Sequence, residues 1–149
     1  MNNKLYIDFD EVKDAIKNFE FNKTFDVILC ITRGGLVPAG LLSYKLNCKK
    51  VINMKVESYD DQKQTLLQID ELDETNWNIL RDAKNILVVD DVYDSGETIT
   101  VVKHELKMQG VSKDKVNTFV VISKQDNAVD YQLYDCKLGT WVVFPWDFE

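Results

Sequence analysis

Carboxylates and a glycine-containing turn follow an apolar run near the middle of the chain. Residues 86–89 are all aliphatic, and they lead directly into Asp90 and Asp91, which are followed by the sequence DSGET at residues 94–98. Two carboxylates at the end of a buried strand are costly unless they bind a partner, and vicinal sugar hydroxyls or a magnesium ion bridged by water are suitable partners. For the pair alone, solvated acids in a surface loop remain the simpler alternative.

The turn after the acid pair has the chemistry of an anion site. If it opens a helix, the backbone N–H groups of residues 95–98 can converge on an anion, and the helix N-terminus adds partial positive charge. The hydroxyls of Ser95 and Thr98 are further donors. An ordinary helix cap is the better explanation of such a turn when it stands alone. Beside two carboxylates, the turn predicts a ribose 5-phosphate, with the acids on the sugar and the amides on the phosphate.

Two more polar junctions follow apolar runs, TRGG after residues 25–31 and SKQDN after residues 116–122. Periodicity predicts helices over residues 9–19, 36–46 and 97–109, and strands over residues 25–31, 51–59, 85–91, 116–122 and 129–135. Residues 60–75 are polar with weak periodicity and are predicted to form a long mobile loop with some hairpin character. Buried strands that alternate with helices indicate an α/β fold with a largely parallel central sheet covered by helices on both faces. Because ligands of such sheets bind at the carboxyl ends of the strands, the three polar junctions are predicted to form one site.

Composition narrows the classes of partner. The 149 residues fit a single domain, residues 1–149. The net charge is −7 and no run of Lys or Arg is present, so we expect no nucleic-acid partner. No apolar segment approaches the ~20 residues that cross a membrane, and the polar start is unlike a signal peptide, so we expect a cytoplasmic protein without membrane insertion. Three widely spaced cysteines without a C-x-x-C pair argue against a disulfide framework and against a zinc site.

Taken together, these segments resemble the type I phosphoribosyltransferases, especially their 6-oxopurine branch, the short bacterial xanthine-guanine and hypoxanthine enzymes. ILVVDDVYDSGET at residues 86–98 is similar to the family's signature for 5-phosphoribosyl 1-pyrophosphate (PRPP), and ITRGGLVPAGLLSYKL at residues 31–46 to its pyrophosphate loop and following helix. ESYDDQKQ at residues 57–64 resembles the start of the mobile catalytic loop, TWVVFPWD at residues 140–147 the purine-binding tail, and KLYIDFDEV at residues 4–12 the usual opening. The resemblance spans nearly the whole chain.

The resemblance implies a fold and a reaction. The fold would be the type I phosphoribosyltransferase sheet with a small hood formed by the chain ends. With Mg²⁺, PRPP and a 6-oxopurine base (guanine, xanthine or hypoxanthine) would give the nucleoside 5′-monophosphate and pyrophosphate, a reaction of purine salvage. Departure of pyrophosphate leaves an oxocarbenium-like ribose, so the site must hold both ends of PRPP. The resemblance also implies a homo-oligomer, a dimer or a tetramer.

Roles for individual residues are implied as well. Pyrophosphate would be bound by Thr32, Arg33, Gly34 and Gly35, and the peptide between Thr32 and Arg33 is often cis in the family. The ribose and its 5′-phosphate would be bound by Asp90, Asp91, Asp94, Ser95, Gly96, Glu97 and Thr98. The purine would meet Lys124 at its O6, Trp141 on its face, Val142 and Asp147, and the metal would be held by Asp90, Asp91 and Asp147. The mobile loop would begin with Ser58 and Tyr59. Catalysis would depend on Asp94, as general acid–base near the purine N7, and on Arg33.

The main alternative is a non-catalytic regulator of the same fold that senses PRPP or nucleotides. Arg33, Asp94 and the pair Ser58-Tyr59 favour the enzyme. A signalling receiver domain also ends a strand with an acid pair, but there the pair lies near the N-terminus and most of the fold follows it. A metal-dependent hydrolase would need a nucleophile or further metal ligands. Glu97 departs from the family pattern by placing a negative charge inside the phosphate turn, so its side chain should point outward.

Overall fold

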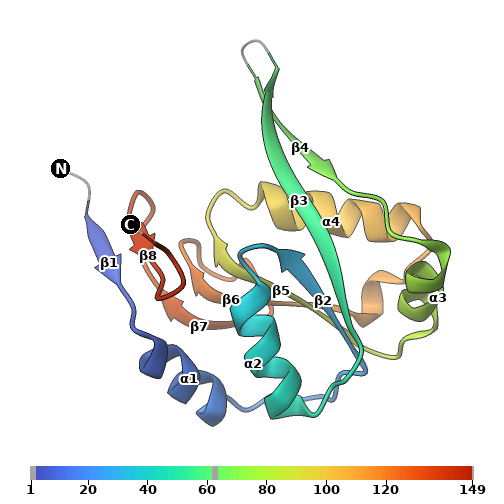
Figure 1. Ribbon diagram of the computed structural model, residues 1–149, viewed down its shortest axis with the longest axis horizontal. Coiled ribbons are helices and arrows are strands. Elements are labelled where there is room, and N and C mark those ends of the chain that lie inside the picture. The colour runs from blue at the N-terminus through green and yellow to red at the C-terminus, as the bar shows by residue number, and fades with distance from the viewer. Residues whose placement is uncertain (1–2, 62–63, 149) are drawn as a thin grey trace.

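A six-stranded sheet forms the centre of the protein, whose computed structural model (Figure 1) describes residues 3–61 and 64–148, with the side chains of residues 59–61 and 64–65 not described. The strand order is β4-β3-β2-β5-β6-β7. The strands are β2 (Val27–Thr32), β3 (Val51–Asp61), β4 (Gln64–Ile69), β5 (Ile86–Tyr93), β6 (Val116–Ser123) and β7 (Tyr131–Asp135). Every pairing in this sheet is parallel except that of β3 with β4, so the prediction of a largely parallel sheet is confirmed.

Helices cover both faces of the sheet, as predicted. The helices are α1 (Phe9–Asn18), α2 (Leu36–Leu46), α3 (Glu74–Asp82) and α4 (Glu97–Met108), with a short 3-10 helix η1 (Lys113–Lys115) before β6. On one face, Val12 of α1 and Leu42 of α2 pack in one buried cluster. On the other face, Leu80 of α3 and Val102 of α4 pack in a second cluster. The two clusters meet the alternating side chains of the central strands, which explains why β2 and β5 read as continuous apolar runs.

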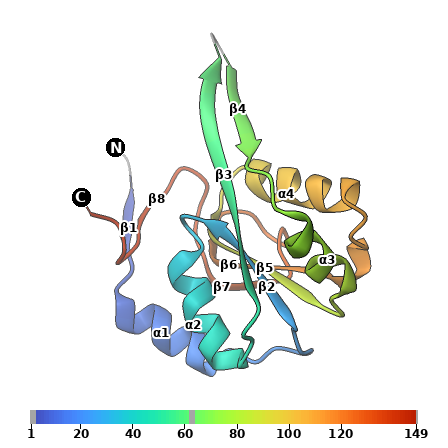
Figure 2. The same ribbon diagram turned by 45° about the vertical axis from the view of Figure 1, so that its right-hand side comes forward.

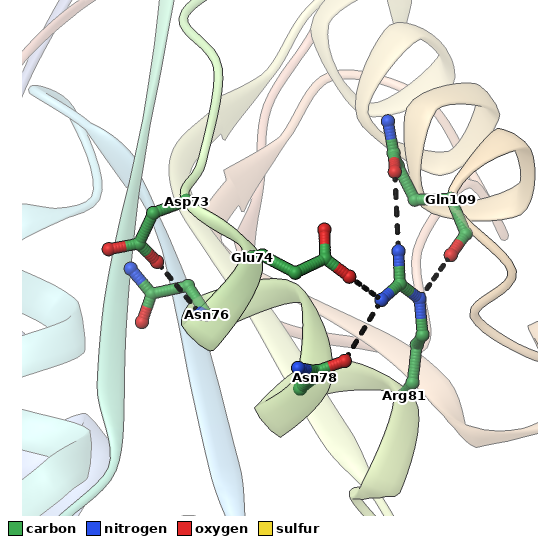
Figure 3. Close-up of polar contacts among 6 residues, drawn as sticks. All are labelled: Asp73, Glu74, Asn76, Asn78, Arg81 and Gln109. Carbon is green, nitrogen blue, oxygen red and sulfur yellow. Dashed lines mark hydrogen bonds and ion pairs between the residues drawn. The ribbon is translucent and has the colours of Figure 1, made fainter.

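Local sequence signals explain where several helices begin and end. The carboxylate of Asp8 accepts a hydrogen bond from the backbone N–H of Glu11 at 2.7 Å and caps α1. Asp73 caps α3 in the same way through Asn76, at 2.8 Å (Figure 3). Helix α2 ends at Asn47, which adopts the left-handed conformation with φ of 49°.

The hairpin character predicted for residues 60–75 is confirmed, but the segment is not one long loop, because β4 and the start of α3 lie within it and residues 62 and 63 lie outside the described residues. Strands β3 and β4 form an antiparallel hairpin with Val56 opposite Ile69, and α3 begins five residues after β4 ends. Figures 1 and 2 show this hairpin projecting beyond the rest of the sheet. The pairing of β4 with β3 supplies backbone hydrogen bonds that a polar, weakly periodic sequence does not reveal. Buried Trp77 and Leu80 then anchor α3 on the sheet.

Helix α3 is also joined to the end of α4 by the guanidinium of Arg81 (Figure 3). Arg81 Nε donates to the backbone oxygen of Gln109 at 2.7 Å, and Nη1 donates to Glu74 Oε1 at 2.6 Å and to Asn78 Oδ1 at 3.1 Å. The network therefore fixes the helix that follows the hairpin against the helix that follows the acid pair.

A small second sheet joins the two ends of the chain. Strand β1 (Lys4–Tyr6) pairs in parallel with β8 (Trp141–Val143), and Figures 1 and 2 show the two ends of the chain side by side. The hood that the resemblance implied is thereby confirmed, although β1 was not predicted from the sequence. The cysteines Cys30, Cys48 and Cys136 are all free. Within the described part of the chain, no helix has the length and hydropathy that crossing a membrane requires.

Candidate functional site

The three polar junctions meet at the carboxyl ends of neighbouring parallel strands. In the order β2-β5-β6, β2 ends at Thr32, β5 ends at Tyr93 and β6 ends at Ser123. A Cβ atom built on Gly34 would lie 2.6 Å from Asp91 Oδ1, so the loops after β2 and β5 touch. The predicted convergence on one edge of the sheet is confirmed.

The acid pair is largely removed from water. Asp90 is 7% exposed, and its Oδ1 accepts a hydrogen bond from the backbone N–H of Asp91 at 2.9 Å. Burial, reinforced by the negative charge of Asp91, raises the pKa of Asp90 well above its ordinary value. Burial also raises the pKa of Asp91, and the charge of Asp147 acts in the same direction. The site therefore concentrates carboxylates in a place that favours a bound cation or hydroxyl donors.

The loop after β2 brings backbone close to these carboxylates. The Thr32–Arg33 peptide is cis, which agrees with the resemblance. Gly35 leaves no room for a side chain, because a Cβ there would lie 2.4 Å from the backbone oxygen of Val89. Its N–H donates to the backbone oxygen of Ile31 at 2.8 Å, which closes a tight turn before α2. Arg33 stands exposed at the apex of this turn.

A cavity of about 730 Å³ lies between this loop, Asp91 and the C-terminal tail. It is lined by Arg33, Gly34, Leu36, Val37, Asp91, Trp146, Asp147 and Phe148. Trp146 stacks on Phe144 with ring centroids 4.8 Å apart and planes inclined by 7°. The carboxylate of Asp147 accepts a hydrogen bond from the backbone N–H of Phe144 at 2.9 Å, so one of its oxygens holds the tail in a turn beside the cavity.

The turn DSGET forms a separate, smaller hollow of about 220 Å³ whose lining runs from Asp90 to Ile99. Gly96 has φ of +89°, which favours glycine, and it supplies no capping side chain at the start of α4. The backbone N–H of Glu97 donates to Ser95 Oγ at 3.4 Å, and the side chain of Glu97 is exposed, as expected. A hollow at a helix N-terminus, where the N-cap glycine has no side chain to bind the first amides, suits an anion.

The loop that follows β6 contacts Asp94 through an ion pair and a hydrogen bond. Lys124 Nζ lies 3.0 Å from Asp94 Oδ2, and the Lys124 side chain is only 10% exposed. The side-chain amide of Gln125 donates to the backbone oxygen of Asp94 at 2.5 Å. The backbone N–H of Lys124 also donates to the backbone oxygen of Tyr93 at 2.9 Å. Two residues predicted to meet the purine and exchange its proton are thus already paired with each other.

Comparison with known proteins decides the family. The phosphoribosyl transferase domain matches residues 8–149. The chain belongs to the phosphoribosyl transferase domain family. A xanthine-guanine phosphoribosyltransferase of Chromohalobacter salexigens is 32% identical over 127 residues, covering 84% of this chain and 70% of the relative. The enzyme of the same name from Idiomarina loihiensis is 29% identical over 154 residues, covering 99% and 89%. A purine phosphoribosyltransferase from Pyrococcus horikoshii has a TM-score of 0.79 at 27% identity over 98% of this chain and 95% of that one.

In this phosphoribosyltransferase, the C-terminal tail places its two tryptophans in different surroundings. Trp141 lies on β8 and is 61% exposed, whereas the cavity beside Arg33 is lined by Trp146. Val142 is half-buried beside Trp141. Both tryptophans belong to the segment TWVVFPWD at residues 140–147. Trp146 lies within the turn in which the Asp147 N–H donates to the backbone oxygen of Phe144, whereas Trp141 precedes that turn.

The remaining predicted residues lie on the hairpin. Ser58 is exposed on β3, opposite Leu67 of β4. The backbone of Tyr59 continues β3, and its side chain lies outside the described residues.

Sequence reasoning missed Tyr93 and Gln125. A Cβ on Gly96 would lie 2.2 Å from the Tyr93 hydroxyl, and both residues adjoin predicted ones, which is the signal that could have found them.

Proposed function

We propose that this phosphoribosyltransferase transfers the 5-phosphoribosyl group of PRPP to a 6-oxopurine base, giving the nucleoside 5′-monophosphate and pyrophosphate in purine salvage. The bases are guanine, xanthine and hypoxanthine. The observation that supports this most strongly is the contact of three loops at one edge of the sheet, with Gly34 against Asp91 and Lys124 against Asp94. The relatives named xanthine-guanine phosphoribosyltransferase support the choice of base.

The sugar phosphate would span the acid pair and the DSGET hollow. Asp90 and Asp91 would accept hydrogen bonds from the ribose hydroxyls, because these donors compensate carboxylates whose burial disfavours the charged form. The amides of residues 95–98 would bind the 5′-phosphate, since they lie at the N-terminus of α4 and the N-cap residue Gly96 has no side chain to occupy them. The sugar would thereby be fixed at both of its ends.

Pyrophosphate would leave toward the loop after β2. The guanidinium of Arg33 suits phosphate oxygens because it can donate two parallel hydrogen bonds. Gly34 allows the chain to approach the sugar site within van der Waals contact of Asp91. The guanidinium of Arg33 would stabilise the negative charge that develops on the departing pyrophosphate, and the carboxylates beside the ribose would stabilise the positive charge that develops on the sugar.

Magnesium would bind on the same side. Asp90, Asp91 and Asp147 are candidates because hard cations prefer carboxylate oxygens, and the charge of Asp147 reaches Asp91. Among the described residues, no three His, Cys, Asp or Glu side chains gather closely enough to hold a metal by themselves. This fits magnesium, which is usually held by one or two carboxylates together with phosphate oxygens of the substrate. When bound, the ion would neutralise charge on the pyrophosphate.

The base would enter beside Asp94 and Lys124. Asp94 would exchange the proton at N7, and Lys124 would donate to O6, an acceptor that amino purines lack at that position. Since Lys124 and Asp94 are paired at 3.0 Å, the incoming base would replace this ion pair with two hydrogen bonds of its own.

A homo-oligomer in the cytoplasm completes the proposal. Large exposed side chains such as Tyr44, at 90%, and Met108, at 68%, are candidates for an interface between copies, and closed dimers or tetramers are common among enzymes. Light scattering after size exclusion would measure the mass.

The decisive assay mixes the protein, Mg²⁺ and PRPP with each 6-oxopurine in turn and follows the monophosphate. Adenine is the control, because its amino group does not accept a hydrogen bond from Lys124. We expect turnover with at least one 6-oxopurine and none with adenine. Binding of PRPP without turnover of any base would instead indicate a non-catalytic sensor of PRPP.

A further inference from the structure

The side chain of Gln125 contacts the backbone of the DSGET turn at residues 94–98, although the family resemblance implies no role for this residue. Its Nε2 donates to the backbone oxygen of Asp94 at 2.5 Å. The acceptor is a carbonyl oxygen, so the amide nitrogen must face it. Gln125 is not among the residues that line the DSGET hollow, so it holds this carbonyl from outside the hollow.

The position of Gln125 is itself fixed. The hydroxyl of Ser123 donates to the backbone oxygen of Gln125 at 2.7 Å and accepts from its backbone N–H at 3.3 Å. Ser123 is 1% exposed and lies opposite Tyr93 in the pairing of β6 with β5. The contact with Asp94 is therefore made by a residue anchored in the central sheet.

Peptide geometry turns this contact into an orientation of the next N–H. The carbonyl of Asp94 and the N–H of Ser95 belong to one planar peptide unit, and in a trans peptide the two groups point in opposite directions. Among the described residues only the Thr32–Arg33 peptide is cis, so the Asp94–Ser95 peptide is trans. A carbonyl held toward Gln125 outside the hollow directs the Ser95 N–H back toward the hollow.

We propose that Gln125 is a positioning residue for phosphate binding, which acts by orienting the Asp94–Ser95 peptide so that its N–H faces the 5′-phosphate. This inference rests on the proposed function and adds to it a residue from the purine-side loop that controls affinity for the sugar phosphate. Lys124 contacts the side chain of the same aspartate, whereas Gln125 contacts its main chain. The two neighbours therefore have separable effects.

The test compares Gln125→Met with wild type and with Gln132→Met. Methionine keeps the length of the side chain and removes the donor. Gln132 is a matched control, because it has the same side chain and its amide donates to Asp135 on its own strand β7 and not to the turn at residues 94–98. Binding of ribose 5-phosphate is measured by calorimetry, and the chemical shift of the Ser95 N–H is followed by NMR during the same titration.

We expect Gln125→Met to weaken ribose 5-phosphate binding about tenfold or more and to reduce the phosphate-induced shift of the Ser95 N–H. In steady-state assays the KM for PRPP should rise by a similar factor, while the KM for the base changes by less than about twofold. Gln132→Met should match wild type in all three measurements, and the thermal unfolding midpoints should show that both variants are folded.

Unchanged ribose 5-phosphate binding in Gln125→Met would overturn the inference, as would an equal loss in Gln132→Met. A wild-type protein that does not bind ribose 5-phosphate would overturn it as well. If the wild type binds ribose 5-phosphate and Gln125→Met does not, yet no base is turned over, the positioning role stands and the proposed reaction is wrong.

Discussion

Three glycine-to-alanine substitutions separate the site from the fold, because each adds one methyl group in a different environment. At Gly34 the new Cβ would lie 2.6–2.7 Å from three atoms of the Asp91 carboxyl group. At Gly35 it would lie 2.4 Å from the backbone oxygen of Val89, and at Gly40 it would meet nothing within 4 Å. The same chemical change should therefore weaken substrate binding at Gly34, destabilise the fold at Gly35, and do neither at Gly40.

The magnitude at Gly34 follows from these contacts. The carboxyl group of Asp91 can rotate away, but it must move by close to 1 Å to restore ordinary van der Waals separation. Misplacement of that size at a reacting centre costs about 10²-fold in rate. We expect Gly34→Ala to lower kcat/KM for PRPP by about 10²-fold, or about 2.7 kcal/mol, while its unfolding free energy stays near that of wild type.

The other two substitutions are the controls. Backbone does not rotate aside, so Gly35→Ala should lose about 1–3 kcal/mol of stability or more in urea unfolding. Gly40 lies inside α2, and alanine there should stabilise the protein by about 0.5–1 kcal/mol with unchanged kinetics. Wild-type kinetics in Gly34→Ala would refute the contact with Asp91, and so would a loss of stability as large as that of Gly35→Ala.

Further predictions concern single charged groups. Asp94→Asn should lower kcat by about 10²–10⁴-fold with little change in PRPP affinity, whereas Asp90→Ala should weaken PRPP binding, and comparable losses in both quantities for both variants would contradict this division. Lys124→Met should raise the KM for the base about tenfold or more and leave PRPP binding nearly unchanged in calorimetry. Because the folded-state pKa values of Asp90 and Asp91 are raised, the ligand-free protein should lose stability as the pH rises from about 4 through those values. Asp90→Asn should then raise the melting temperature more at pH 7 than at pH 4, and the opposite order would exclude the pKa shift. Arg81→Ala should cost about 1–2 kcal/mol in urea unfolding without changing either KM.

Apolar runs and the residues that follow them were sufficient to predict five of the six strands of the central sheet and the edge at which the polar junctions lie. β2, β5 and β6 are each buried on both faces, so their sequences contain short runs of apolar residues that are readily assigned as strands. The polar junctions after these runs then had to meet, because the carboxyl ends of adjacent parallel strands lie together. These features depend on local sequence and on one general rule.

Elements that depend on distant partners could not be predicted in the same way. Strand β1 has three residues, and its partner Trp141–Val143 lies at the opposite end of the chain. Helix α3 presents only Trp77 and Leu80 as buried side chains among polar neighbours, so its periodicity is weak. In both cases a tertiary partner supplies the stabilisation that local propensity lacks.

The fine geometry of the site depends on strand register, which no local pattern specifies. Tyr93 lies opposite Ser123, and this pairing brings Lys124 and Gln125 alongside Asp94. A shift of β6 by one residue would turn its alternating side chains to the other face and would move the loop that grips Asp94. The buried apolar side chains oppose such a shift, because those of β5 divide between the two clusters and Phe119, Val121 and Ile122 of β6 pack in the first. The core therefore fixes the register in which the ammonium of Lys124 and the amide of Gln125 reach the same aspartate.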